Sequence, residues 1–250
     1  MSNIITCKGL VIRETAYGES DKCLTVLTDE RGSITVFCKG AKNYKSKYFV
    51  VSSLFCYGDM VLYEKGDRYW LSEGSLIENF FGIRDDISTF ALAQYFLDVT
   101  CDITNENQRD PGVLRLLLNT LFVLSKKQKP LPLVKAVFEM RLCSLCGFAP
   151  DLVGCAKCGA YENERMYFDI PNGAIFCGKC ASSEVKKTPV SSTVLHAMRW
   201  ALFCDMSRLF SFEIPEDEMR SFSSICERYI LTHLDRGFKT LDFYHDIEGL

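Results

Sequence analysis

The chain has 250 residues, of which 48% are hydrophobic and 24% are charged, a composition typical of a globular protein that can bury a core. Its formal net charge of −3 excludes a uniformly basic nucleic-acid-binding surface, so any anion-binding site must be a local patch. No apolar run reaches the length of a membrane span, and the start MSNIITCKGLVI lacks the features of a secretory signal, which predicts a cytoplasmic protein with reduced thiols.

Residues 1–80 have the pattern of short strands separated by turns. Segments 6–14, 22–28 and 33–39 are rich in Val, Ile, Leu and Thr, and SITVFC (33–38) shows period-two alternation. The sequence DERG (29–32) and residues 65–67, between segments 59–64 and 68–78, are typical of hairpin turns. About five short strands with tight turns predict a small β-barrel.

Beyond residue 81 the apolar residues recur three and four positions apart, which indicates packed helices. Such segments lie at 88–103, 111–127, 131–148 and 194–210, and another begins after Pro215, where three acids suit the positive end of the helix dipole. Ser191 or Ser192 can cap the helix at 194–210. We therefore predict an α+β multidomain protein, with a barrel at 1–80, a helical domain in two parts at 81–150 and 188–250, and a Cys-rich insert at 151–187.

The insert contains two C-x2-C pairs in the spacing C-x2-C-x18-C-x2-C, which is typical of a structural zinc site. Each tight knuckle places two thiolates on one side, and two knuckles close a tetrahedron around one ion. Four protein ligands leave no open position, so the metal would hold the fold and perform no chemistry. The predicted ligands are Cys155, Cys158, Cys177 and Cys180.

Two alternatives stay open for these cysteines. A third C-x2-C pair, Cys143 and Cys146, lies in a helical pattern that favours a core role, but it could displace one pair from the metal. Alternatively, none of the cysteines binds a metal. The stretch GAIFCGKC (173–180) nearly matches a phosphate-binding loop, but Cys180 cannot supply the hydroxyl that ligates magnesium, so we reject a nucleotide site.

Nothing in the sequence indicates a catalytic centre. The three histidines, His196 and His233 on predicted helices and His245 in the C-terminal tail, belong to no recognisable nucleophile or metal-hydrolase motif. This pattern favours a binding protein over an enzyme.

Residues 38–48, CKGAKNYKSKY, form a segment that we call the lysine loop, in which four lysines occur without an acid. The loop follows a strand of the predicted barrel, a fold whose strands and loops bind single-stranded nucleic acid. Lysines can contact phosphates while tyrosines stack on bases, although a solvated surface is the alternative. The candidate DNA-binding residues are Lys39, Lys42, Lys45, Lys47, Tyr44 and Tyr48 in the loop, with Lys22 and Arg13 nearby.

Three stretches carry motifs of one known family. Residues 17–48 contain a YGE-x-D turn, a T-x-E-x-G hairpin and a K-G-A-[RK] loop that ends in K-S. The stretch LCGFAPDLVGCAKCG (145–159) contains G-x-x-P-x-L-x-x-C-x-x-C-G, and HLDRGFKTLDF (233–243) matches a C-terminal helix end. These motifs occur in the family's order and are spread over essentially the full length of the sequence. In them the chain resembles the RecO family of recombination mediators.

The resemblance implies an N-terminal OB-fold, a helical domain, and an inserted module that holds one structural zinc ion. It also implies binding to single- and double-stranded DNA and annealing of complementary strands. With RecR, such proteins help to load RecA onto strands coated by single-stranded-DNA-binding protein, whose acidic tail would bind the helical domain. RecF is a further implied partner, and the implied location is the nucleoid in the cytoplasm.

By position, the family's DNA-contacting residues map onto Lys22, Lys39, Lys42, Lys45 and Lys47. Lys42 stands where arginine is frequent in the family, and lysine offers a point charge in place of a bidentate fork. Two other classes of function are a zinc-stabilised adaptor that acts only through protein contacts, and a metal-dependent enzyme, which would need an open coordination position.

Overall fold

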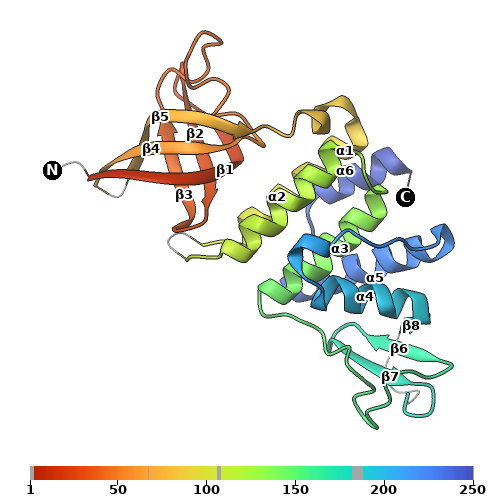
Figure 1. The fold of residues 1–250 in the computed structure, drawn as a ribbon. Coiled ribbons are helices and arrows are strands. Elements are labelled where there is room, and N and C mark those ends of the chain that lie inside the picture. Colours follow the sequence, from red (N-terminus) through yellow and green to blue (C-terminus); the bar gives the residue numbers. More distant parts are fainter. Residues whose placement is uncertain (1–2, 67, 106–107, 182–187, 250) are drawn as a thin grey trace. The chain divides into compact units, whose positions relative to one another are not determined.

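The computed structural model describes residues 3–66, 68–105, 108–181 and 188–249 (Figure 1). The chain divides into two compact units, one formed by residues 1–125 with 240–250 and the other by residues 126–239. Within the described ranges, no helix combines the length and the apolar character needed to cross a membrane. The prediction of a barrel followed by helices is confirmed.

The first unit begins with a closed barrel in the strand order β1-β2-β3-β5-β4. Its neighbouring strands run antiparallel, except that β3 and β5 pair in parallel, with Val36 opposite Tyr69 and Phe37 opposite Trp70. This parallel pairing joins the first three strands to the β4–β5 hairpin. The strands are β1 (Asn3–Tyr17), β2 (Asp21–Thr28), β3 (Gly32–Cys38), β4 (Tyr57–Lys65) and β5 (Arg68–Glu78).

Alternate side chains of the strands fill the barrel. Ile34, Val36 and Cys38 of β3 are buried, whereas Phe37 between them is only half-buried, as the alternation in SITVFC predicts. Gly9 of β1 allows a close approach of β2, because an added Cβ would lie 2.3 Å from a methyl group of Val26. The alternation therefore assigns one face of each strand to the core and the other to the surface.

Helices α1 (Ile87–Ile103), α2 (Pro111–Ser125) and most of α6 (Lys239–Glu248) complete the first unit. The Asp86 carboxylate accepts a 2.8 Å hydrogen bond from the Thr89 amide and so caps α1. Thr240 of α6 donates to Asp98 of α1 at 3.1 Å. His245, in the C-terminal tail of the sequence, lies in the last turn of α6.

The second unit contains α3 (Leu131–Leu145), α4 (Ser192–Phe203), α5 (Glu216–Leu234) and a three-stranded sheet in the order β7-β6-β8. Ser191 caps α4 by accepting from the Val194 amide at 3.1 Å, as predicted. The helix ends before the predicted residue 210 because Cys204 is extended and its carbonyl accepts from the Arg141 guanidinium. The strands are β6 (Met166–Asp169), β7 (Ala174–Cys177) and β8 (Thr188–Val190).

A buried charge cluster joins α3 to α5. The Lys135 ammonium lies 3.0 Å from a carboxylate oxygen of Glu139 and 2.6 Å from one of Glu227. The side chains of Lys135 and Glu139 are 1% and 0% exposed. Burial alone would lower the pKa of Lys135, but the two carboxylates outweigh it and raise the pKa above its ordinary 10.5. Lys135 therefore stays charged and balances two carboxylates.

Replacing Lys135 by Met should strongly destabilise the second unit. The substitution leaves Glu139 buried without its cation, and removal of one partner of a buried ion pair typically costs about 3–5 kcal/mol. Lys129→Met is the matched control, because the partner of Lys129, Glu213, is 91% exposed and such pairs contribute about 1 kcal/mol or less. Urea unfolding followed by circular dichroism measures both variants. Equal stability of the two variants would contradict a structural role for the cluster.

Candidate nucleic-acid interface and metal centre

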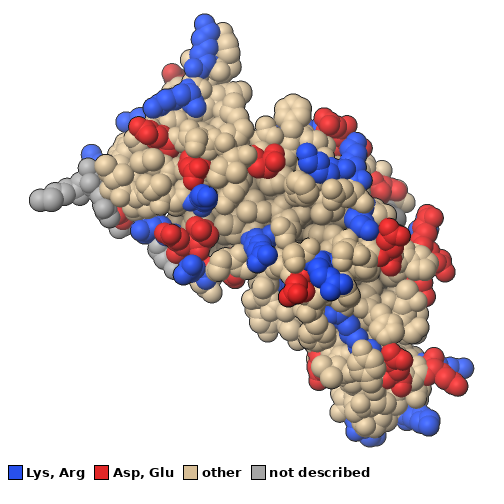
Figure 2. All heavy atoms as spheres, viewed as in Figure 1, with Lys and Arg blue, Asp and Glu red and all other residues tan. Residues whose placement is uncertain are grey.

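The lysine loop begins at the last residue of β3 and projects from the barrel. Lys39, Lys45 and Lys47 are exposed, and the side chain of Tyr44 is 74% exposed. In the space-filling view, Lys and Arg side chains occupy the tip of the projection that Figure 1 draws as a loop beyond the barrel strands (Figure 2). The loop thus presents several ammonium groups and one aromatic face to solvent.

The start of the loop is fixed to the turn between β1 and β2. The Asp21 carboxylate accepts from the Gly40 amide at 2.8 Å, and this bond, with one from the Ser20 hydroxyl, holds the pKa of Asp21 below its ordinary 3.8. Lys42 donates to the Gly18 carbonyl at 2.7 Å. Lys42 is thus both a candidate phosphate contact and a structural tie.

The end of the loop is fixed to β5. Lys47 and the Tyr48 hydroxyl both donate to the Ser72 carbonyl, at 3.3 and 2.6 Å. Tyr48 is half-buried and packs against the barrel core, so it anchors the loop. Lys39 lies over the Trp70 ring, with its ammonium nitrogen 5.2 Å from the ring centre. The loop is therefore held against the strand that carries Trp70.

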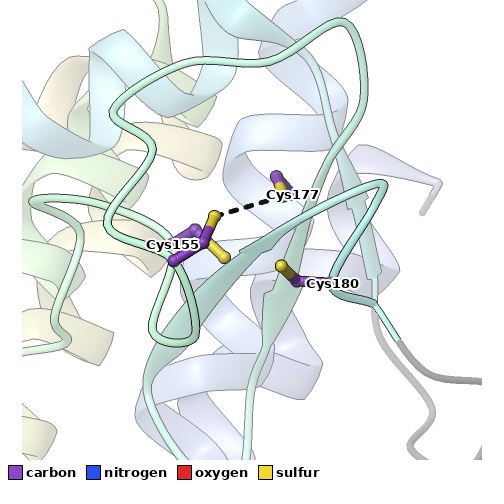
Figure 3. A group of neighbouring side chains, drawn as sticks. Cys155, Cys177 and Cys180 are labelled. Atoms are coloured by element: carbon purple, nitrogen blue, oxygen red, sulfur yellow. Dashed lines mark hydrogen bonds between the residues drawn. The ribbon is translucent and has the colours of Figure 1, made fainter.

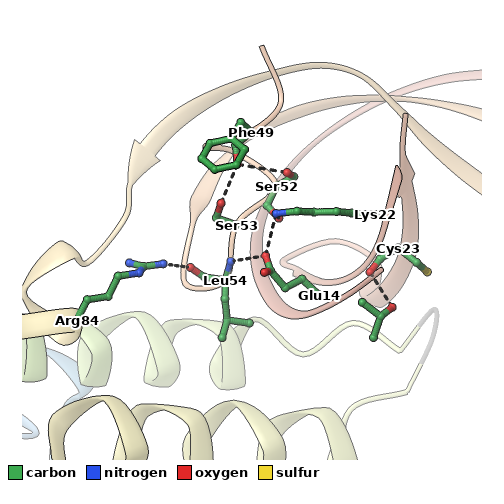
Figure 4. A network of polar contacts seen from close by, with 9 residues as sticks. Glu14, Lys22, Cys23, Phe49, Ser52, Ser53, Leu54 and Arg84 are labelled. Carbon is green, nitrogen blue, oxygen red and sulfur yellow. Dashed lines mark hydrogen bonds and ion pairs between the residues drawn. The ribbon is translucent and has the colours of Figure 1, made fainter. Parts of the chain in front are cut away.

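Lys22 and Arg13 each have a carboxylate partner in the chain. Lys22 pairs with Glu14 at 3.2 Å, its side chain is 13% exposed, and Glu14 also accepts from the Leu54 amide at 3.1 Å (Figure 4). Arg13 pairs with Asp98 of α1 at 3.3 Å and lines a cavity of about 570 Å³ between β1 and α1. Lys22 therefore contacts the segment 52–54 that follows the lysine loop, and Arg13 points toward α1.

Two residues beside the loop escaped the sequence analysis. Trp70 lies under Lys39, and the Arg68 guanidinium lies 5.7 Å from the centre of the Phe37 ring. Trp70 precedes Leu71, which is buried, and side chains alternate along a strand. This alternation could have identified Trp70 as an outward-facing residue. Strands β3 and β5 are far apart in the sequence, so the sequence alone did not show that Trp70 lies close to Lys39.

The four predicted metal ligands come together in the second unit, where their sulfur atoms all lie within 4.8 Å of one another (Figure 3). The Sγ atoms of Cys158 and Cys177 are 3.7 Å apart. Zinc–sulfur bonds of about 2.3 Å in a tetrahedron place sulfurs roughly 3.8 Å apart, so the donor set and spacing fit a four-thiolate metal site. Cys143 is buried on α3, outside this group.

Backbone hydrogen bonds shape both knuckles. The Gly159 amide donates to the Cys155 carbonyl at 2.8 Å, and the Ala181 amide donates to the Cys177 carbonyl at 2.9 Å. Gly159 has a φ of +74°, which glycine adopts without strain. Burial acts to raise the pKa of the Cys155 thiol, but amide donors including that of Cys177 outweigh it and lower the pKa to about 6. These amides thus favour the thiolate form of Cys155, the form that binds metal.

The cysteine module, by which we mean residues 148–181, is attached to α4 and α5 by two large side chains. Arg199 of α4 is 6% exposed and donates to the carbonyls of Leu152 and Tyr161, at 2.8 and 2.7 Å. Tyr229 of α5 donates through its hydroxyl to the Phe148 carbonyl at 2.7 Å. The module is therefore built into the core of its unit.

Comparisons with known proteins agree with this architecture. The family models for the N-terminal and C-terminal parts of recombination protein O match residues 1–80 and 84–242. The DNA repair protein RecO of Acetivibrio thermocellus is 33% identical over 249 residues, which cover 99% of each chain. The RecO protein of Bacillus subtilis is 25% identical over 244 residues, covering 98% of this chain and 95% of its own. The chain therefore belongs to the RecO family of DNA repair proteins.

Proposed function

We propose that this protein binds DNA through the lysine loop and anneals complementary single strands during recombinational repair. The observation that carries the proposal is the exposure of Lys39, Lys45 and Lys47 on a loop anchored to the barrel of a DNA repair protein family. Annealing needs no catalytic group, because neutralising two strands lowers their repulsion and raises their local concentration. The protein would act on DNA of the nucleoid, in the cytoplasm.

Contacts of this kind read no base sequence. Lysine–phosphate contacts position a strand but carry no sequence information, so we expect binding without base-sequence preference. With RecR, and with RecF as a further partner, the bound protein would help to load RecA onto strands coated by single-stranded-DNA-binding protein. Family membership supports these partners.

Replacing Lys39, Lys42, Lys45 and Lys47 together by Ala should sharply weaken the binding of single-stranded DNA. The slope of log affinity against log salt is negative, and each lost phosphate contact reduces its magnitude by about 0.7, so the loss of four contacts reduces the magnitude by about 3. Fluorescence anisotropy with a labelled oligonucleotide over a salt series measures the slope, and a strand-annealing assay measures the outcome.

The control removes four lysines outside the loop, Lys8, Lys126, Lys127 and Lys239, all of which are exposed. This variant has the same net charge as the loop variant, so a difference between the two locates the interface. Equal salt slopes in the two variants would refute the lysine loop as the DNA site. Failure of the unsubstituted chain to retain DNA even at low salt would favour the alternative, an adaptor that acts only through protein contacts.

We further propose that Cys155, Cys158, Cys177 and Cys180 hold one structural zinc ion within the insert predicted at 151–187, of which residues 182–187 lie outside the described part of the chain. The ion would join the two knuckles and so stabilise the loops before β6 and after β7. No coordination position is left for substrate, which sets the site apart from a catalytic zinc centre.

Cys177→Ser should reduce the zinc content from about one ion per chain to well below one, because a single lost thiolate opens the tetrahedron. Metal analysis of the purified chain, together with thiol titration in native and denatured protein, measures the change. Cys146→Ser is the control, since Cys146 lies outside the group of four. Loss of zinc in the Cys146 variant but not in the Cys177 variant would assign the metal to the other cysteine pair.

A second surface supports binding of an acidic tail from single-stranded-DNA-binding protein. In the second unit, a cavity of about 650 Å³ is lined by Ile170, Pro171 and Leu231. Two cations, Arg228 and Arg236, and one carboxylate, Asp235, are also on its wall, so positive charge predominates. Both arginines are exposed, and a guanidinium fork matches a carboxylate. We therefore propose this cavity as the docking site for the tail.

Arg228→Ala combined with Arg236→Ala should weaken binding of the isolated tail peptide by about a hundredfold or more, since each charge-assisted hydrogen bond contributes about 1.5–3 kcal/mol. Isothermal titration calorimetry with the synthetic peptide measures the change. Arg220→Ala is the control, because Arg220 is exposed on α5, the helix that carries Arg228, but does not line the cavity. If the double variant bound the peptide with wild-type affinity, this cavity would not be the docking site of the tail.

A further inference from the structure

Four aromatic side chains form a continuous row across the barrel. They come from four strands, with Phe37 of β3 opposite Trp70 of β5, and Trp70 opposite Tyr63 of β4. The ring centres of Phe37 and Trp70 are 5.0 Å apart, those of Trp70 and Tyr63 are 6.3 Å apart, and Tyr17 at the end of β1 meets Phe37 at 5.1 Å. We call these four residues the aromatic row.

The aromatic row lies on the outer face of the barrel. The strand neighbours of its members, Val36, Cys38, Leu62 and Leu71, are buried, and side chains alternate between the faces of a strand. Tyr17 is 45% exposed, and the other three rings are half-buried by one another. Four adjoining aromatic rings on an outer surface exceed what a barrel needs for its own core and indicate a binding surface.

Two cations adjoin the row. The Lys39 ammonium lies 5.2 Å from the centre of the Trp70 ring, and the Arg68 guanidinium lies 5.7 Å from the centre of the Phe37 ring. Lys39 is also the first lysine of the lysine loop, and Lys47 lies over Ser72, two residues beyond Trp70 on the same strand. Aromatic faces beside ammonium and guanidinium groups match the faces of nucleobases beside their phosphates.

We propose that the aromatic row stacks on the bases of single-stranded DNA while the lysine loop and Arg68 hold its phosphates. The bases of a duplex are stacked on one another, so their faces are closed to the row, whereas phosphates are available in both forms. The aromatic row would therefore make the protein bind single strands more tightly than duplex. This inference rests on the proposed DNA binding and extends it to the part of the ligand that is recognised.

Trp70→Leu is the decisive variant, and Trp200→Leu is its matched control, since the chain has two tryptophans and Trp200 lies on α4 of the other unit. Affinities are measured for an oligothymidylate, for an abasic oligonucleotide of the same length, and for a duplex. Stacking on one ring corresponds to about 5- to 150-fold in affinity. We expect Trp70→Leu to lose about tenfold for the oligothymidylate, with no change for the abasic strand or the duplex.

A second measurement leaves the row intact. In a Trp200→Phe variant, Trp70 is the sole tryptophan, and its fluorescence should be quenched by the oligothymidylate but not by the abasic strand. This readout does not depend on whether the Trp70→Leu variant folds.

Equal losses for single strand, abasic strand and duplex in Trp70→Leu, or unquenched Trp70 at saturating oligothymidylate, would overturn the aromatic row as a stacking surface. The proposed DNA binding would survive that result if the lysine-loop variant still lost affinity for all three ligands. Absence of DNA binding by the unsubstituted chain would overturn both.

Discussion

The parallel pairing of β3 with β5 is the constraint on which the proposed DNA interface depends. It places Phe37 opposite Trp70 and thereby joins two strands that are separated in sequence by the lysine loop and β4. Because the loop leaves from the end of β3, the same pairing brings Lys39 over Trp70 and lets Lys47 reach Ser72. A slip of one residue would exchange the faces of β5 and turn Trp70 into the core.

The chain uses charge in two opposite ways. In the second unit, Lys135 is buried between Glu139 and Glu227, where it serves only the packing of α3 on α5. On the barrel, the lysine loop keeps Lys39 and Lys45 in solvent, where they can exchange counterions for phosphates. A net charge of −3 is therefore compatible with DNA binding, because the relevant charge is local.

Much of the architecture could be predicted from the sequence because its signals are local. Period-two alternation located β3, the three- and four-residue spacing located α1 to α5, and the C-x2-C pairs identified the four clustered cysteines. Long-range pairing was not predictable in this way. The predicted DNA-binding residues therefore included Tyr48, whose hydroxyl donates a hydrogen bond to the Ser72 carbonyl. They did not include Trp70, which lies beside the lysine loop only because the barrel closes.

The most direct test of the account is photocrosslinking of a bromodeoxyuridine-substituted single strand to the unsubstituted chain, followed by peptide mapping. Crosslinks should fall within residues 37–48 and 63–70, where the lysine loop and three members of the aromatic row lie. Crosslinks confined to residues 126–239 would place the bound strand on the other unit and contradict the barrel as the DNA-binding element.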